Sequence, residues 1–310
     1  MKAWPRTAIR VAGWLLSLLA LGFFARLVLR QGLALPEDSR GQIFAILALS
    51  SLAYGAMVAL LALIWSGFAA DSRPASGSAA RLFPAYLTSQ FAKYIPGNIF
   101  QFAARHAMGR QLGLDHASLG FAAVAEASLL VGAAVAIVIA QGQTALQTFF
   151  PKLPHIPNWS AGVLLLGCVA VWSAPLPRIA RWLPRYPWQK VSVAILGYLL
   201  FFALFGLIFY VILHRTTPLQ PDITRVVTHG SLAWLVGFVV PGAPAGAGMR
   251  EAVLALAAGE QGRTSAVLTA ILLFRLVTLI GDFLALCAGL SLQRAIGRAT
   301  ARTAPSSTLR

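Results

Sequence analysis

Four ionisable side chains lie inside long apolar stretches of this sequence, and they are the first candidates for chemistry. They are Lys93, Glu126, Arg275 and Asp282. An ionised group is costly in hydrocarbon, so such residues pair with one another or face a water-filled path. Arg275 and Asp282 are two helical turns apart on one helix face, so we expect them to pair with Glu126 and Lys93. Two interpretations are open: structural ion pairs that hold two parts of the protein together, or a polar route through an apolar body.

Two further apolar segments are interrupted at their middle by a Pro-Gly pair. Pro96-Gly97 divides residues 82–112, and Pro241-Gly242 divides residues 226–259. Proline removes a backbone donor and glycine adopts conformations that end a helix, so each pair predicts a helix break. Within a membrane, broken backbone is tolerated only where protein or a wet cavity covers it. We therefore predict two broken helices beside a covered cavity.

Residues near these breaks have the chemistry to bind an anion. A half-helix that starts at a break directs unpaired N–H groups and a positive dipole end at the cavity, which suits a phosphate. Arg105 and Arg250 lie about two turns beyond the two breaks, and we expect them near the membrane interfaces. The predicted headgroup-binding residues are Lys93, Asn98, Arg105 and Arg250. The alternative for both arginines is that they only extend their charges to the interface.

The second broken segment adds glycines and one more acid. Gly246 and Gly248 follow the break, and together with Gly242 they allow a ligand or a neighbouring helix to approach the backbone closely. Ligand approach and simple helix packing are equally compatible with this pattern. Glu251 directly follows Arg250. We predict that it takes part in intramembrane ion pairs, as do the buried acids and Arg275.

The other reactive residue types form no pattern that predicts catalysis. There is no nucleophile–base pair, no phosphate-binding glycine loop and no CxxC motif, and Cys168 and Cys287 each lie in an apolar stretch. His106 and His116 are expected to be too far apart on a helix to share one metal ion. The sequence therefore predicts neither an enzyme nor a bound metal or cofactor.

The composition indicates a membrane protein. Of 310 residues, 58% are hydrophobic and 11% are charged, whereas soluble domains contain about 25% charged residues. The mean hydropathy is +0.74. A net charge of +16 in a soluble protein would suggest a nucleic-acid partner. Here the basic residues lie between apolar stretches, where they orient helices and meet anionic lipid, so we predict no nucleic-acid partner.

Six stretches are predicted to be full transmembrane helices, because about 20 apolar residues cross a bilayer. They are residues 15–29, 43–69, 117–140, 160–174, 191–213 and 265–290. The first is interpreted as a retained anchor and the fourth as a short or tilted span. With the two broken segments they form one all-α membrane domain, residues 1–293. We expect the basic tail, residues 294–310, to be disordered.

The two broken segments resemble each other. Residues at matching places are Pro96 and Pro241, Arg105 and Arg250, and Glu126 and Arg275. This indicates an internal repeat with halves at about residues 82–140 and 226–291. If each broken segment is a re-entrant hairpin, three full spans separate the two hairpins. An odd number of spans inverts one half relative to the other, which is the arrangement that many transporters use.

The distribution of basic residues then predicts the orientation. In the hairpin model both termini, residues 71–81, the stretch after Arg105 and residues 175–190 lie on one side. That side carries the larger share of the 25 Lys and Arg residues. Loops rich in Lys and Arg stay in the cytoplasm, so both termini are predicted to be cytoplasmic.

Two segments resemble signatures of a known family. The run Lys93-Tyr-Ile-Pro-Gly-Asn-Ile-Phe-Gln-Phe-Ala-Ala-Arg105 resembles the first signature of the lysylphosphatidylglycerol synthase transmembrane-region family, also called flippase-like domain proteins. The glycine-rich stretch from Pro241 to Glu251 resembles the second signature, with Ala243-Pro-Ala between its glycines. The resemblance covers residues 11–290. It implies a lipid translocase fold similar to the membrane part of the multiple peptide resistance factor, and we expect no lipid synthesis because the synthase domain has no counterpart here.

These observations lead to an expected function. We expect a protein of the bacterial inner membrane that binds an anionic lipid, such as a phospholipid or a polyprenyl-phosphate-linked substrate, and flips or presents it. One alternative is a non-transporting scaffold that assists a separate lipid-modifying enzyme or lipid-linked glycosyltransferase. Another is an integral lipid-modifying enzyme. A lipid-sized groove between the hairpins would favour transport, a filled bundle would favour the scaffold, and a convergent acid–base cluster would favour the enzyme.

Overall fold

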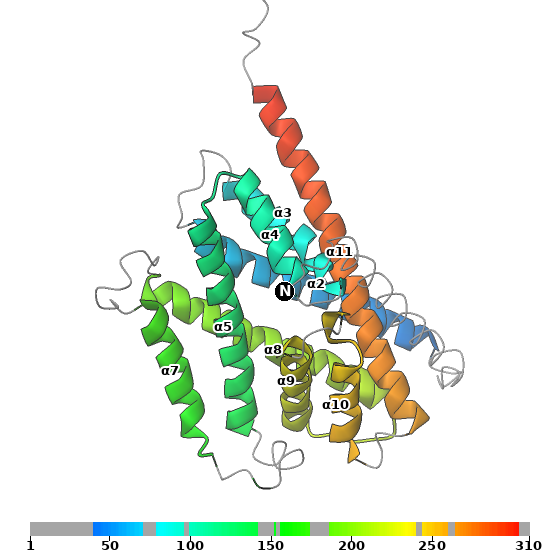
Figure 1. Ribbon diagram of the computed structural model, residues 1–310. Helices are drawn as coiled ribbons and strands as arrows, with labels where there is room; N and C mark the ends of the chain where they lie inside the picture. The colour runs from blue at the N-terminus through cyan, green and yellow to red at the C-terminus, as the bar shows by residue number, and fades with distance from the viewer. Residues whose placement is uncertain are drawn as a thin grey trace, which may run out of the picture.

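The computed structural model describes residues 40–70, 79–95, 99–141, 152, 156–173, 186–239, 244–259 and 264–303. Every regular element in these ranges is a helix (Figure 1). The long helices are α2 (Arg40–Ala70), α5 (His116–Gln141), α8 (Trp188–Thr216) and α11 (Ser265–Thr303). The shorter helices are α3 (Leu82–Gln90), α4 (Phe100–Gln111), α7 (Trp159–Ser173), α9 (Ile223–Val239) and α10 (Met249–Ala257). Short 3-10 turns are η2 (Ala79–Arg81), η3 (Phe91–Tyr94) and η5 (Pro244–Gly246).

Helices α2, α5, α8 and α11 are long and apolar enough to cross a membrane. They coincide with four of the six predicted spans. Helix α7 has 15 residues and α9 has 17, which is shorter than the roughly 20 residues of a usual crossing. The predicted span at residues 15–29 lies outside the described residues. Leu49 on α2 and Leu166 on α7 are 68% and 70% exposed, as suits side chains that face lipid.

Helix α11 is longer than the sequence predicted. It continues without interruption to Thr303, so the expected disorder from Arg294 onward is wrong for residues 294–303. This stretch is rich in alanine and arginine, which are strong helix formers. It extends an existing helix, and adding residues to a formed helix avoids the cost of starting a new one. Residues 304–310 lie outside the described part.

Helices α5 and α9 begin at aspartates that act as N-caps. Asp115 Oδ1 accepts a hydrogen bond from the Ser118 backbone N–H at 2.8 Å, and Asp115 Oδ2 accepts one from Ser118 Oγ at 2.6 Å. These bonds to Ser118 hold the pKa of Asp115 below its usual value. Asp222 Oδ1 accepts bonds from the backbone N–H groups of Thr224 and Arg225 at 2.8 and 3.0 Å. Each cap satisfies N–H groups that a helix start otherwise leaves unpaired.

Both segments that carry a Pro-Gly pair are two helices packed against each other. Helix α3 with η3 packs against α4, and α9 packs against α10. Turn η3 of the first pair also contacts η5 of the second pair, so the two interrupted segments meet inside the molecule. Figure 1 shows α4 rising toward the upper end of α5, whereas α9 and α10 extend toward the lower ends of α5 and α11.

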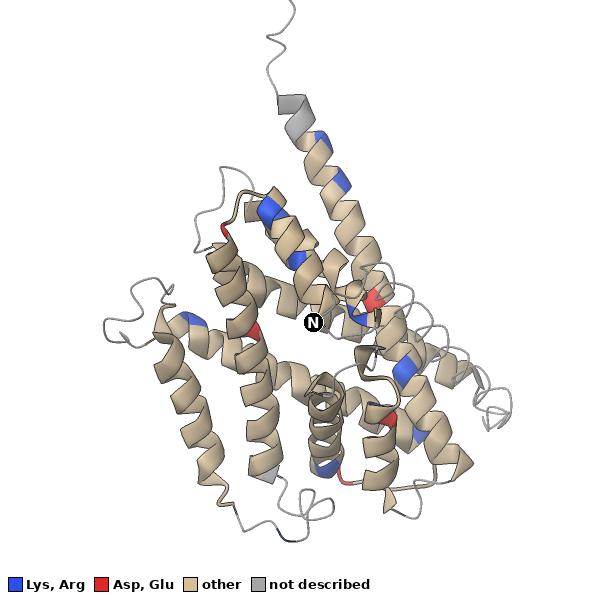
Figure 2. Cartoon of the chain, viewed as in Figure 1, with Lys and Arg blue, Asp and Glu red and all other residues tan. Residues whose placement is uncertain are grey.

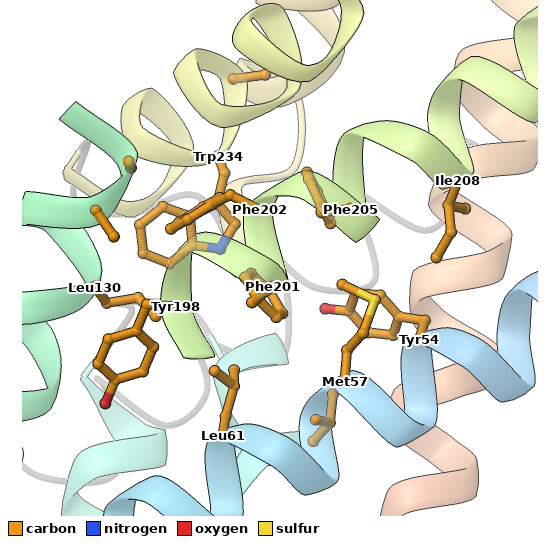
Figure 3. Packing of buried hydrophobic residues seen from close by; sticks show 14 of the residues in the cluster. Tyr54, Met57, Leu61, Leu130, Tyr198, Phe201, Phe202, Phe205, Ile208 and Trp234 are labelled. Carbon is orange, nitrogen blue, oxygen red and sulfur yellow. The ribbon is translucent and has the colours of Figure 1, made fainter. Parts of the chain in front are cut away.

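Aromatic side chains of α8 fill the space between its neighbours (Figure 3). Phe202 meets Trp234 of α9 edge-on at 5.0 Å between ring centroids. Phe205 meets Phe274 of α11 at 4.8 Å, and Phe201 lies 6.5 Å from the ring of Tyr54 on α2. Such ring pairs add about 0.5–1.5 kcal/mol each to the stabilisation from area burial. Helix α8 is therefore the centre around which α2, α9 and α11 pack.

Helices α2 and α11 cross at a pair of glycines. A Cβ atom built at Gly281 would lie 2.8 Å from the backbone oxygen of Ser51 and 2.7 Å from the ring of Tyr54. A Cβ at Gly55 would lie 3.4 Å from the backbone oxygen of Gly281. The absence of side chains lets the two backbones approach closely, as in other helix pairs of membrane proteins. This crossing brings Asp282 of α11 toward the centre of the molecule.

We predict that Gly281→Ala destabilises the protein by about 1–3 kcal/mol, because the added methyl group meets backbone that cannot move aside. Gly162→Ala is the matched control, since Gly162 is also in an apolar helix and has nothing within 4 Å of a built Cβ. Thermal unfolding in detergent measures both variants. An equal melting temperature for the two variants would contradict the close crossing.

Candidate functional site

Charged residues are sparse along the helices, and several lie midway along the bundle (Figure 2). Three ion pairs account for most of the buried charge among the described residues. They are Lys93–Asp282, Arg105–Glu126 and Glu251–Arg275. Each joins residues from two different elements, so each also holds part of the fold in place.

The first pair joins η3 to α11. Lys93 Nζ donates to Asp282 Oδ1 at 2.8 Å and lies 2.7 Å from Oδ2. Tyr94 donates its hydroxyl to Asp282 Oδ2 at 2.7 Å, and Lys93 Nζ lies 3.4 Å from the hydroxyl oxygen of Tyr54. Asp282 is 0% exposed, and these donors replace the water that its carboxylate loses on burial. The predicted pairing of Lys93 with Asp282 across the two halves is thus present.

The second pair joins α4 to α5. Arg105 Nη1 donates to Glu126 Oε2, and Tyr86 donates its hydroxyl to Glu126 Oε1 at 2.6 Å. The other guanidinium nitrogens of Arg105 reach Ser89 Oγ at 3.3 Å and Gln90 Oε1 at 3.1 Å. Arg105 is 2% exposed, so its expected position near a membrane interface is wrong. Its guanidinium lies over the Tyr86 ring at 3.6 Å, and each of its nitrogens already has a partner.

The third pair joins α10 to α11. Arg275 Nε lies 3.5 Å from Glu251 Oε1, and Glu251 Oε2 accepts a bond from the Gly248 backbone N–H at 2.6 Å. Arg275 Nη1 donates to the backbone oxygen of Ala245 at 3.0 Å. Ala245 has φ 48°, a left-handed conformation that costs free energy for a residue with a Cβ atom. The arginine therefore supports the turn that precedes α10.

Glu126 and Arg275 do not pair with each other, contrary to the sequence prediction. Each finds an opposite charge within its own half, Arg105 for Glu126 and Glu251 for Arg275. Nor do the two share a cavity, because they line different ones. Sequence matching identified equivalent positions correctly as charged, but equivalent positions of a repeat need not contact each other. The parallel between the halves is instead that each contains one ion pair of its own. The earlier residue is the cation in the first half and the anion in the second half.

Arg250 differs from the other buried cations. Its Nε is buried and has no hydrogen-bond partner among the described residues. Its guanidinium lies 5.9 Å from the centre of the Trp234 ring. A Cβ atom built at Gly237 would lie 2.6 Å from Arg250 Cγ, and one at Gly246 would lie 2.8 Å from Arg250 Nε. The two glycines thus make room for the arginine side chain to cross them.

Arg250 reaches a central cavity of about 50 Å³ between the two halves. This is space for a few water molecules or one phosphate-sized group. Its polar lining includes Lys93, Gln101, Arg105 and Glu126 from the first half and Arg250 from the second half. The buried Oε1 of Gln101 also has no hydrogen-bond partner among the described residues. Among the described residues, the cavity therefore presents one unpaired arginine N–H and one unpaired amide oxygen to whatever occupies it.

Two further spaces share lining residues with this cavity or with each other. Arg250 also lines a space of about 10 Å³ beside Glu251 and Arg275. Leu254, one turn further along α10, lines both that space and a cavity of about 480 Å³ at the α8–α9 connection. Arg225 and His229 of α9 contribute to the larger cavity. The three spaces thus neighbour one another through Arg250 and Leu254, from the central cavity to the end of the molecule where α8 and α9 meet.

The residues predicted at the two helix breaks are only partly described by the structure. Pro96, Gly97, Asn98, Pro241 and Gly242 lie outside the described residues. Gly246 and Gly248 have φ of 72° and 85°, which favours glycine at both positions. Arg250 and the backbone of Gly237 approach Gly246, and nothing lies within 4 Å of a Cβ built at Gly248. Close packing is therefore the observed role at Gly246.

The sequence analysis did not identify the tyrosines that support the ion pairs or the amide of Gln101. Tyr94 and Gln101 both lie within the first signature-like run, so their positions beside the Pro-Gly pair were an available signal. Tyr54, Tyr86 and Trp234 come from other parts of the chain. No local pattern marks them, because their roles depend on tertiary packing.

The predicted separation of His106 and His116 is also wrong. His106 Nε2 lies 2.9 Å from His116 Nδ1, and the rings stack at 5.1 Å between centroids. The two residues are on different helices, α4 and α5, that a tight connection brings together. Gly113 in this connection has φ 87°. Within the described ranges, no group of three or more His, Cys, Asp or Glu residues could hold a metal ion.

Comparison of the sequence with protein-family models finds no match. Comparison with curated proteins finds none either.

We predict that Asp282→Asn lowers the free energy of unfolding by about 3–5 kcal/mol, because it leaves the Lys93 charge buried without a counter-charge. The double variant Lys93→Met with Asp282→Asn should recover part of this loss, since the unpaired cation is gone. Denaturant titration in detergent measures both, with Asp222→Asn as the control at an exposed acid. A loss from Asp282→Asn no larger than that of the control would contradict a stabilising pair.

Proposed function

We propose that the protein binds the headgroup of an anionic membrane lipid in the central cavity and translocates that lipid between leaflets. The observation that carries this proposal is the buried Nε of Arg250, which has no partner among the described residues and lines a cavity between the two halves. An unpaired guanidinium donor in an apolar surrounding costs free energy, and an anion relieves that cost. Arginine also offers a planar set of donors that matches phosphate oxygens.

The proposed architecture is an inverted repeat in a bacterial inner membrane, with both termini in the cytoplasm. In it, α3–α4 and α9–α10 are re-entrant hairpins from opposite faces, and six helices cross fully. The packing of each hairpin on itself and the contact between η3 and η5 support this arrangement. So does the family resemblance of the two Pro-Gly segments, which suggests a flippase-like protein of the lysylphosphatidylglycerol synthase transmembrane-region family.

A path for the lipid is suggested by the spaces that share Arg250 and Leu254. In the proposed orientation they lead from the central cavity to the outer face at the α8–α9 connection. The central cavity of about 50 Å³ is smaller than the roughly 300 Å³ or more of a usual ligand pocket. We therefore infer that this conformation is occluded and that the hairpins separate to admit a whole headgroup.

The same small volume favours a second candidate, a scaffold that holds a lipid for a separate lipid-modifying enzyme or glycosyltransferase without moving it. A filled bundle is what this alternative predicts. The two functions differ in one measurable quantity, which is transfer of labelled lipid between leaflets of vesicles that contain the purified protein. Binding with no transfer would favour the scaffold.

We predict that Arg250→Gln weakens binding of phosphatidylglycerol more than tenfold, because a charge-assisted hydrogen bond contributes about 1.5–3 kcal/mol. Arg105→Gln tests the other predicted arginine, whose nitrogens already have protein partners, and should act mainly on stability. Arg298→Gln is the control that removes one positive charge from an exposed position on α11. Lipid binding is measured by native mass spectrometry at matched protein levels. Retained binding in Arg250→Gln would refute Arg250 as the headgroup ligand.

We predict the orientation from single cysteines in a background where both native cysteines are replaced by serine. The positions are Ala80, Gln111, Gln189 and Gln220, all of them exposed. An impermeant thiol reagent applied to intact cells should label only the cysteine at Gln220. The other three should react after permeabilisation, because both ends of the first hairpin and the start of α8 then face the cytoplasm. External labelling at Gln111 but not at Ala80 would mean that α3–α4 crosses the membrane.

A further inference from the structure

The charges around the central cavity favour one kind of headgroup, and this inference rests on the proposed function. Lys93 has Asp282, Arg105 has Glu126 and Arg275 has Glu251. Each pair is neutral as a unit, wherever the shared proton resides. Arg250 lines the same small space as Glu251 and Arg275, so two arginines face one carboxylate there. Among the described residues the cluster therefore carries one uncompensated positive charge.

We propose that the site selects lipids whose headgroup is a singly charged phosphodiester with a neutral hydroxyl-bearing substituent. One negative charge neutralises the cluster, whereas a second negative charge would be buried without a partner. A phosphomonoester carries about −1.5 to −2 charges near neutral pH, so it fits less well. A headgroup with an added ammonium group would instead leave one positive charge uncompensated.

Gln101 supplies the second, independent observation. It is 9% exposed, lines the cavity and has a buried Oε1 without a hydrogen-bond partner among the described residues. Arg250 can only donate, so it serves the phosphate oxygens. The free Oε1 of Gln101 can only accept, so it suits a hydroxyl group, which can donate to it. A hydroxyl next to the phosphodiester would satisfy this Oε1, which an unprotonated phosphate oxygen cannot do.

Competitive lipid binding in detergent at pH 8, read by native mass spectrometry, tests the charge selection. The competing lipids have matched acyl chains and are phosphatidylglycerol, phosphatidic acid and phosphatidylethanolamine, with phosphatidylcholine as the baseline. The wild-type protein should retain phosphatidylglycerol over phosphatidic acid and phosphatidylethanolamine by about tenfold or more, because an unpaired buried charge costs several kcal/mol. Equal or stronger retention of phosphatidic acid would overturn the inference while leaving the proposed function intact. No retention of any of these lipids above phosphatidylcholine would instead refute the proposed function.

A charge variant sharpens the test. Glu251→Gln adds one positive charge to the cluster, and glutamine can still accept the bond from the Gly248 backbone N–H that caps α10. This variant should move the preference toward phosphatidic acid by about tenfold. Asp115→Asn changes the net charge equally at an exposed helix cap outside the cavity, and should leave the preference unchanged. An unchanged preference in Glu251→Gln, or an equal shift in Asp115→Asn, would contradict selection by the cluster charge.

Phosphatidylmethanol tests the hydroxyl group, because it has the same phosphodiester and charge as phosphatidylglycerol but no headgroup hydroxyl. Wild-type protein should prefer phosphatidylglycerol over phosphatidylmethanol, and Gln101→Leu should abolish that preference while keeping the preference for both over phosphatidic acid. Equal binding of the two diesters by the wild-type protein would overturn the role assigned to Gln101.

Discussion

In hydrocarbon, a charged or broken part of a protein has no water to satisfy it, and this constraint determines how the chain is arranged. Asp282 forms an ion pair with Lys93 and accepts a hydrogen bond from Tyr94, and the close crossing of α2 with α11 lies beside it. Glu126 accepts hydrogen bonds from Arg105 and Tyr86. The turn at Ala245 receives a side-chain donor from Arg275. Each contact joins two different elements. The helices must therefore pack together for these polar groups to find their partners.

Arg250 differs from these residues, because its buried Nε has no hydrogen-bond partner among the described residues. This difference is the basis of the proposed function. The side chain lies against Trp234 and two glycines beside the central cavity. A structural role alone would favour replacing it with an apolar residue, because a buried donor without a partner is destabilising. Its presence is understandable if an anion arrives from outside the chain. Under the proposed function, the neutral pairs around it are the electrostatic background for binding a single negative charge.

How much of this was predictable depends on the range of the interaction. The apolar lengths of α2, α5 and α8 are local properties, and the sequence predicted these helices within a few residues, as it did the start of α11. The charged residues in apolar stretches were also identified, and Lys93 with Asp282 was predicted as a pair. The partner of Glu126 was missed because Arg105 was placed at an interface, and residue spacing alone does not tell how deep a half-helix starts. The contact of His106 with His116 was missed because it depends on how the connection between α4 and α5 turns in space. The helical end of α11 was missed because it depends on how far a long helix continues.

The direct test of the account is whether the guanidinium of Arg250 contacts a lipid phosphorus atom. Solid-state NMR of arginine-¹⁵N-labelled protein in phosphatidylglycerol bilayers measures this through dipolar dephasing between ¹⁵N and ³¹P. A hydrogen bond from guanidinium to phosphate oxygen places phosphorus within about 4 Å of nitrogen. We predict that part of the guanidinium signal of the wild-type protein is dephased by phosphorus and that this part is absent in Arg250→Gln. Arginines at the bilayer surface contribute a background dephasing that is the same in both proteins. Dephasing that is identical in the two proteins would show that Arg250 does not bind the headgroup, and would contradict the central claim.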